Sequence, residues 1–214
     1  MERKDKKVVP LIMVYNNVRK ELVSQTKRTL RENTEYPVML FFREDGMRGH
    51  HKVEYIKLRN EMVEDIPFGW EHIVFTDDDL YFNKGWLRAM MKAYKNNPDV
   101  WVLAATKWKT HTLIEEREDI SVMGRFSGGC LLMSKKVWEK CGPFEIDLKK
   151  TVLFWEKVHA LGGKIAILND EMKIIHCGVK SIINRRGRSL ESEEMIQSLA
   201  DRVKAKTNRD QKIY

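Results

Sequence analysis

Three consecutive carboxylates, Asp77, Asp78 and Asp79, are the side chains of this sequence best suited to chemistry. Like charges at this spacing repel one another, and a divalent cation would offset the repulsion. Alternate residues of an extended chain point the same way, so Asp77 and Asp79 can face one site while Asp78 faces elsewhere. The triplet predicts a metal site, and it leaves open a solvated acidic turn that caps a helix.

The residues around the triplet place it at the end of a strand. The apolar run from Ile73 to Phe75 is too short for a helix and predicts a buried strand. Asn83 can cap the helix that follows, in which apolar residues from Trp86 to Tyr94 have helical spacing. Ligands of open α/β sheets bind beyond the carboxyl ends of strands, which is where this order puts the carboxylates.

A second pair of carboxylates follows another predicted strand. Residues 8–15 predict a buried first strand, a helix follows to about Asn33, and residues 38–42 predict a second strand that leads into Glu44 and Asp45. The order strand, helix, strand indicates a right-handed crossover and a parallel sheet. Both carboxylate groups should therefore line one edge of an α/β fold, a single domain whose mostly parallel central sheet is flanked by helices.

The pattern continues toward the carboxyl terminus. Further helices are expected over residues 53–66, from a Ser134 cap to Trp138, and over 151–161, and further strands over 100–105, 130–133, 164–168 and 172–176. We expect residues 106–124 to form an irregular polar loop. The domain should span residues 1–177, and residues 178–214 should form a polar arm with one helix.

Composition narrows the class of protein. With 214 residues, 43% hydrophobic and 33% charged, the chain suits one α/β domain. No window of about 18 apolar residues exists, and the charged amino terminus does not resemble a secretory signal. Three cysteines without a C-x-x-C pair fit a reducing cytoplasm. The net charge of +8 favours anionic ligands without choosing among nucleic acid, phosphorylated small molecules and acidic lipids.

Six motifs, in this order along the chain, resemble those of GT-A-fold glycosyltransferases, particularly glycosyltransferase family 2. The resemblance runs from about Val8 to Cys177. The motifs are Ile12 to Asn16 (with Met13 where the family usually has proline), Glu44-Asp45-Gly46, Arg59-Asn60, the DXD pattern within Phe75 to Asp79, Gly128-Gly129-Cys130 through Phe144-Glu145, and His176.

The resemblance implies a metal-dependent enzyme that moves a sugar from a nucleoside diphosphate sugar to an acceptor hydroxyl. Bound Mn²⁺ or Mg²⁺ would offset the charge that grows on the leaving diphosphate. The residues that would hold the ion are Asp77, Asp79 and His176. The residues that would bind the donor are Tyr15, Asn16, Glu44, Asp45, Arg59, Asp77 and Asp78.

One departure from the family concerns the base that deprotonates the acceptor. The register set by residues 151–155 and Gly162-Gly163 puts Lys149-Lys150 where inverting members carry a carboxylate pair. Asp147 is the nearest carboxylate and the candidate base, with Glu145 and Glu156 as alternatives. Retention and inversion of the anomeric configuration both stay open.

The acceptor would be a glycan, a protein or a lipid-linked molecule. Trp101, Trp108 and Trp155 are candidates for stacking on a sugar ring, Trp108 foremost. Lys149-Lys150 keeps open a non-catalytic protein of the same fold. A metal-dependent nuclease or nucleic-acid-binding protein is the other alternative, but the sequence lacks the basic stripe with interleaved aromatic residues that it would need. A nucleotidyltransferase is disfavoured because no glycine-rich loop follows the first strand.

Overall fold

The computed structural model describes most of the first 177 residues. The described ranges are 8–16, 20–46, 52–105, 112–124, 129–145, 153–170 and 173–177. The chain divides into two units, residues 1–176 and 177–214, and every element described below belongs to the first unit. The predicted arm and its helix lie outside the described residues.

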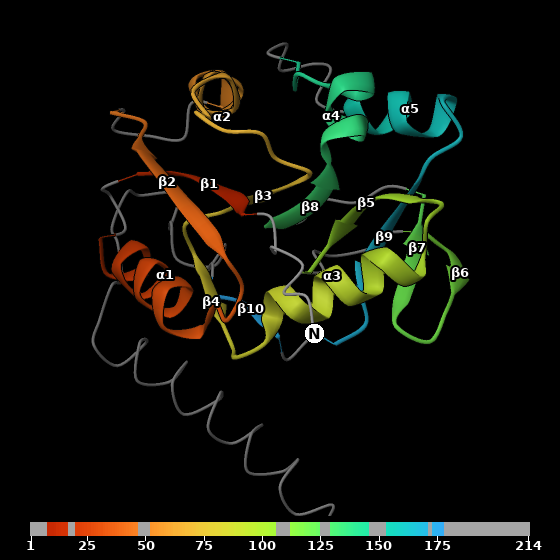
Figure 1. The fold of residues 1–214 in the computed structure, drawn as a ribbon, viewed down its shortest axis with the longest axis horizontal. Helices are drawn as coiled ribbons and strands as arrows, with labels where there is room; N and C mark the ends of the chain where they lie inside the picture. Colours follow the sequence, from red (N-terminus) through yellow and green to blue (C-terminus); the bar gives the residue numbers. More distant parts are fainter. Residues whose placement is uncertain are drawn as a thin grey trace, which may run out of the picture. The chain divides into compact units, whose positions relative to one another are not determined.

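An eight-stranded sheet forms the centre of this unit, in the order β2-β1-β3-β8-β5-β9-β7-β6 (Figure 1). Its strands are β1 (Val9–Tyr15), β2 (Val38–Glu44), β3 (His72–Thr76), β5 (Val100–Ala104), β6 (Leu113–Glu116), β7 (Ile120–Met123), β8 (Cys130–Ser134) and β9 (Lys164–Leu168). Only β7 and β8 run against the other strands, so the sheet is mostly parallel, as expected. A separate antiparallel pair joins β4 (Leu80–Phe82) and β10 (Ile174–His176).

Helices cover both faces of the sheet (Figure 1). They are α1 (Lys20–Asn33), α2 (Lys52–Glu64), α3 (Trp86–Asn96), α4 (Lys135–Cys141) and α5 (Leu153–Ala160). Apolar residues of α1, α3 and β4 pack with Leu11 and Met13 on one face. Residues of α2, α4 and α5 pack with Ile12 and Val14 on the other. Successive residues of β1 thus enter opposite layers, which explains its uninterrupted apolar run.

Two predictions of local structure near the carboxylate triplet are wrong. The chain after Asp79 forms β4 before it reaches α3, because Leu80 and Phe82 are buried against α1 and α3. Asn83 does not cap α3: the N-cap position is Gly85, whose φ of 74° is left-handed, and it makes no side-chain cap bond. A glycine tolerates this backbone conformation without steric cost.

The expected loop over residues 106–124 is also wrong for its described part, residues 112–124. That part is an antiparallel hairpin of β6 and β7, which extends the sheet from β9. An ion-pair network fastens the hairpin: the Arg117 guanidinium lies 2.8 Å from both Asp99 and Glu115. Lys164 Nζ bridges the same two carboxylates at 3.0 and 3.1 Å. In β6, whose residues are exposed or half-buried, charged partners therefore replace the apolar alternation that usually marks a strand.

Ser134 caps α4 as predicted, because its side chain accepts a hydrogen bond from the Val137 amide. Gly162, with φ of 83°, follows the end of α5, also as predicted. Among the helices that the structure describes, none combines the length and the apolar character that crossing a membrane requires.

Candidate active site

Three candidate metal ligands converge beside the carboxyl end of β3. The antiparallel pairing of β10 with β4 sets His176 opposite Leu80, and this register brings the imidazole next to Asp79. His176 Nε2 lies 3.3 Å from Asp79 Oδ1. One ligand atom from each of Asp77, Asp79 and His176 lies within 4.8 Å of the others.

This donor set fits a divalent cation. Two ligands on one small octahedral ion, each about 2.1 Å from it and at right angles, lie about 3 Å apart, close to the observed spacing of Asp79 and His176. Two carboxylates supply hard oxygen donors, and an imidazole is a suitable further ligand for a transition metal. Asp79 is only 6% exposed, so an ion there would be largely screened from water by protein.

Asp77 is held in place by two residues of α2. Tyr55 Oη donates a hydrogen bond to Asp77 Oδ1 across 2.6 Å, and Arg59 Nη2 donates to the same oxygen across 2.9 Å. Arg59 also donates to the Thr76 carbonyl, and its guanidinium lies 4.2 Å from the centre of the Tyr55 ring. Because both side-chain bonds reach Oδ1, Oδ2 is the oxygen that can turn toward a cation.

Burial keeps Tyr55 a hydrogen-bond donor. It raises the pKa of the Tyr55 hydroxyl well above its usual value, and the charge of Asp77 adds to this rise while Arg59 opposes it. The hydroxyl therefore stays protonated through the neutral range. Its proton is available to orient Asp77 at any pH at which the protein would be assayed.

A second set of predicted residues meets at the ends of β1 and β2. Asn16 Nδ2 donates to both carboxylate oxygens of Asp45, at 3.1 and 3.3 Å. The Asp45 amide donates to the Tyr15 carbonyl. Tyr15 pairs with Glu44 in the β1–β2 register, and the Glu44 side chain is exposed. Asp45 is thus oriented by Asn16, while Glu44 points into solvent at the same edge of the sheet.

Asp78 connects the two sets of residues. The Asp78 Oδ2 atom accepts a hydrogen bond from the backbone amide of Asn16 at 3.1 Å, and Asp78 is 4% exposed. Thr26 Oγ1 donates to the carbonyls of Asp78 and Leu80, which fixes the backbone of the triplet. The expected alternation is therefore present: Asp77 and Asp79 face His176 in the carboxylate cluster, and Asp78 is turned toward the end of β1.

Other predicted site residues are placed only in part. Asp147, the candidate base, lies outside the described residues, as do Lys149-Lys150, Gly128 and Trp108. The alternative base Glu145 forms an ion pair with Lys157 at 2.8 Å. Glu156 is exposed on α5. Gly129, from the glycine motif, accepts a hydrogen bond from the Asp77 amide and so borders the cluster.

Sequence reasoning missed two residues of this region. Tyr55 precedes Arg59 by four positions on α2, so the two share one helix face, and that spacing was the signal available. Lys27 Nζ lies 3.3 Å from the centre of the Tyr15 ring, a cation–π contact that no local pattern announces.

No protein-family model matches this sequence, and no curated protein sequence matches it significantly. Solved structures do match. A mannosyltransferase from Pyrobaculum calidifontis, PcManGT, determined in complex with GDP-Man and Mn²⁺, aligns over 83% of this chain with a TM-score of 0.57 and 14% identity. GalNAc-T7, determined with UDP, GalNAc and Mn²⁺, aligns over 77% with a TM-score of 0.55 and 8% identity.

The chain spans 59% of the length of the mannosyltransferase and 43% of the length of GalNAc-T7. At these identities the likeness concerns the arrangement of helices and strands. The chain therefore has the GT-A glycosyltransferase fold.

Proposed function

We propose that this protein is a metal-dependent glycosyltransferase that uses a nucleoside diphosphate sugar as donor. The observation that carries the proposal is the convergence of Asp77, Asp79 and His176 at the carboxyl end of β3. Carboxylates and an imidazole in this position suit a divalent ion on a diphosphate. Two of the structural neighbours, one determined with GDP-Man and Mn²⁺ and the other with UDP, GalNAc and Mn²⁺, support the same reading.

In this proposal, separate groups of residues bind the metal ion, orient its ligands and border the nucleoside. Asp79, His176 and Asp77 would hold Mn²⁺ or Mg²⁺, which when bound offsets the charge of the leaving diphosphate. The imidazole favours Mn²⁺. Tyr55 and Arg59 orient Asp77. Asn16 orients Asp45, which together with Tyr15, Glu44 and Asp78 borders the place proposed for the nucleoside.

The proposed acceptor hydroxyl belongs to a glycan, a protein or a lipid-linked molecule. Asp147 remains the proposed base, and its substitution by Asn should lower turnover without weakening binding of the donor. Unchanged turnover of Asp147→Asn would remove it from that role.

The test is the melting temperature with UDP, GDP, CDP and dTDP, each with and without Mn²⁺. A ligand that binds only the folded state, at about 100 times its dissociation constant, adds about 2.7 kcal/mol of stability. We expect one nucleotide to raise the melting temperature only when Mn²⁺ is present. Asp79→Asn and His176→Ala should abolish this rise.

Asp65→Asn is the matched control. Asp65 is an exposed carboxylate that pairs with Arg43 at 2.7 Å, away from the cluster. Its variant should keep the full rise in melting temperature. The absence of a rise with every nucleotide, or its persistence in Asp79→Asn, would contradict the proposal. If one nucleotide does raise the melting temperature with Mn²⁺, release of the nucleoside diphosphate from the matching sugar donor would establish turnover.

A further inference from the structure

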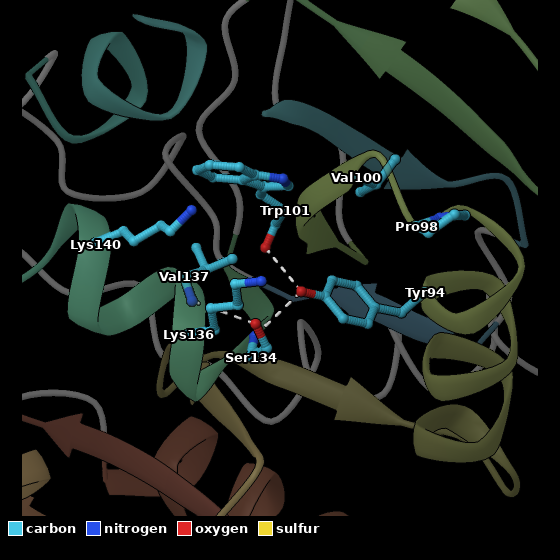
Figure 2. Close-up of a pocket in the computed structure, with 8 residues that line it drawn as sticks. All are labelled: Tyr94, Pro98, Val100, Trp101, Ser134, Lys136, Val137 and Lys140. Atoms are coloured by element: carbon cyan, nitrogen blue, oxygen red, sulfur yellow. Dashed lines mark hydrogen bonds between the residues drawn. The ribbon is translucent and has the colours of Figure 1, made fainter. Parts of the chain in front are cut away.

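A cavity lies at the opposite end of β8 from the carboxylate cluster. Its volume is about 250 Å³, and it lies among α3, β5 and α4 (Figure 2). Ser134 lines it at the end of β8, whose other end, Cys130, pairs with Thr76 beside the triplet. Four residue steps along a strand span about 13 Å, so the two sites are separate.

One wall of the cavity is aromatic and fixed in position. Tyr94 Oη donates a hydrogen bond to the Trp101 carbonyl at 3.1 Å and accepts one from the Ser134 amide at 3.2 Å. Figure 2 shows both bonds converging on this hydroxyl. The backbone of Gly163 packs so closely against the Trp101 indole that a Cβ would overlap the ring. Trp101 is nevertheless half-buried only, and its side chain lines the cavity.

The part of the lining that α4 supplies carries two positive charges. Lys136 and Lys140 both line the cavity from α4, four positions apart on one helix face. Lys140 Nζ lies 5.0 Å from the centre of a Trp101 ring, and Figure 2 shows this side chain extending toward the indole. Among the described residues, neither lysine forms an ion pair, and the cavity lining contains no carboxylate.

The neighbouring face of the same helix shows the contrast. There Lys135 is followed four positions later by Glu139, and the two charges lie 3.7 Å apart. Like charges four positions apart destabilise a helix by about as much as opposite charges stabilise it. The pair formed by Lys136 and Lys140 therefore carries a small cost that a bound anion would remove.

We propose that this cavity binds an acidic sugar unit, a pyranose ring that bears a carboxylate or a phosphate. The apolar C–H face of such a ring packs on the negative face of an indole, and its anionic group would meet the two lysines. Trp101 offers a flat wall of this kind, and Ser134, Val137 and the lysine side chains suit a ring with one apolar face and a polar rim. Pockets for drug-sized ligands begin at about 300 Å³, so the observed volume suits a single sugar unit.

The proposal is independent of the transferase activity, because binding is measured directly. The full chain is labelled with ¹⁵N at its indole nitrogens, of which the sequence has six. The Trp101 signal is assigned by its loss in Trp101→Phe. Glucuronate, glucose 6-phosphate, neutral glucose and benzoate are titrated in turn, without nucleotide or metal.

We expect glucuronate or glucose 6-phosphate to shift the Trp101 signal in a saturable manner, and the more effective of the two identifies the anionic group. Lys136→Gln and Lys140→Gln should each weaken this binding about tenfold, as expected for loss of one charge-assisted hydrogen bond. Lys135→Gln, which makes the same charge change on the other face of α4, should leave it unchanged.

Three results would overturn the proposal. The first is no saturable shift of the Trp101 signal with either acidic sugar. The second is equal binding of glucose, which would remove the role of the lysines. The third is binding of benzoate with no binding of the acidic sugars, which would make the cavity a site for aromatic carboxylates. A failure of nucleotides to bind at the carboxylate cluster would affect none of these measurements.

Discussion

Tyr55 donates a 2.6 Å hydrogen bond to Asp77, and so a residue of α2 orients a carboxylate that follows β3. Arg59 donates to the same carboxylate oxygen, so the orientation of Asp77 is fixed from one side only. The other oxygen can face a cation without giving up either bond. This relationship makes Tyr55 a positioning residue of the proposed metal site.

Substitution Tyr55→Phe removes the hydroxyl and keeps the ring under Arg59. Partners that orient a metal ligand typically contribute 10- to 100-fold to metal affinity, and because Arg59 remains, we expect a loss of about tenfold for Mn²⁺. Titration of the protein with Mn²⁺, followed by electron paramagnetic resonance of the free ion, measures the affinity. Tyr94→Phe removes another half-buried hydroxyl, which bonds to Ser134 at the far end of β8 from Asp77, and serves as the control. Equal affinities in the two variants would show that Tyr55 does not position Asp77.

Asp78 and Asp79 should respond differently to removal although they are adjacent. Asp78→Ala leaves the Asn16 amide without its buried acceptor, which costs about 1–3 kcal/mol of folding free energy. Its effect on Mn²⁺ affinity should be small. Asp79→Ala removes a proposed metal ligand and relieves repulsion between the carboxylates. It should therefore abolish the gain in stability that Mn²⁺ gives, and it should lower the stability of the metal-free protein little. Urea unfolding in EDTA and in Mn²⁺ separates the two effects, and identical behaviour would refute the division of roles.

Much of this site follows from local pattern. The run from Ile73 to Phe75 predicts a strand because every residue is buried in the sheet, and the carboxylates that follow are placed correctly at its end. His176 cannot be placed in this way. Its approach to Asp79 depends on pairing between β4 and β10, each three residues long, and a pattern of three residues has no readable period.

The hairpin of β6 and β7 escapes prediction for a different reason. Leu113 and Ile114 are exposed, and the charged residues that follow pair with Asp99, just before β5, and with Lys164 on β9. Ionic contacts across strands have no periodic signature in sequence. The start of α3 is similar, because Asn83 looks like a cap while the left-handed Gly85 takes that position.

Gly163→Ala should destabilise the protein more than a glycine substitution usually does. The new Cβ would overlap the Trp101 indole, and overpacking of this kind costs about 1–3 kcal/mol. Gly69→Ala is the matched control, because nothing lies within 4 Å of its Cβ position. Chemical denaturation should show a lowered midpoint for Gly163→Ala alone. Equal midpoints would mean that Trp101 can move aside at no cost.

The ion-pair network of the hairpin should give stability that depends on pH. Hydrogen bonds from Arg117 lower the pKa of Glu115 to about 2, and they hold the pKa of Asp99 well below its usual value. Both carboxylates ionise near pH 4 when unfolded. A lowered folded-state pKa adds stability above the unfolded pKa, and this contribution is lost as the pH falls through the folded value.

Arg117→Gln should therefore be less stable than the wild type by a constant amount from pH 7 to about pH 5, and the gap should shrink below about pH 4. Because these groups are partly exposed, added salt should narrow the gap at neutral pH as well. Urea midpoints across the pH range measure it. Arg88→Gln, which breaks a single exposed pair with Glu35, should change stability little at every pH. A gap for Arg117→Gln that stays constant down to pH 3 would contradict this account.

In the small sheet of β4 and β10, the affinity of the proposed site for a metal ion should depend on how stably the two strands pair. A two-stranded ribbon by itself is marginally stable in water, and this one supplies Asp79 from the residue before one strand and His176 from the other. An ion held by both residues would cross-link the ribbon. Because such coupling is reciprocal, a change that stabilises the pairing of β4 with β10 should also raise the affinity for the ion. Substitutions in β10 that never approach the ion, such as changes at Ile174, should thus alter its affinity through the pairing alone.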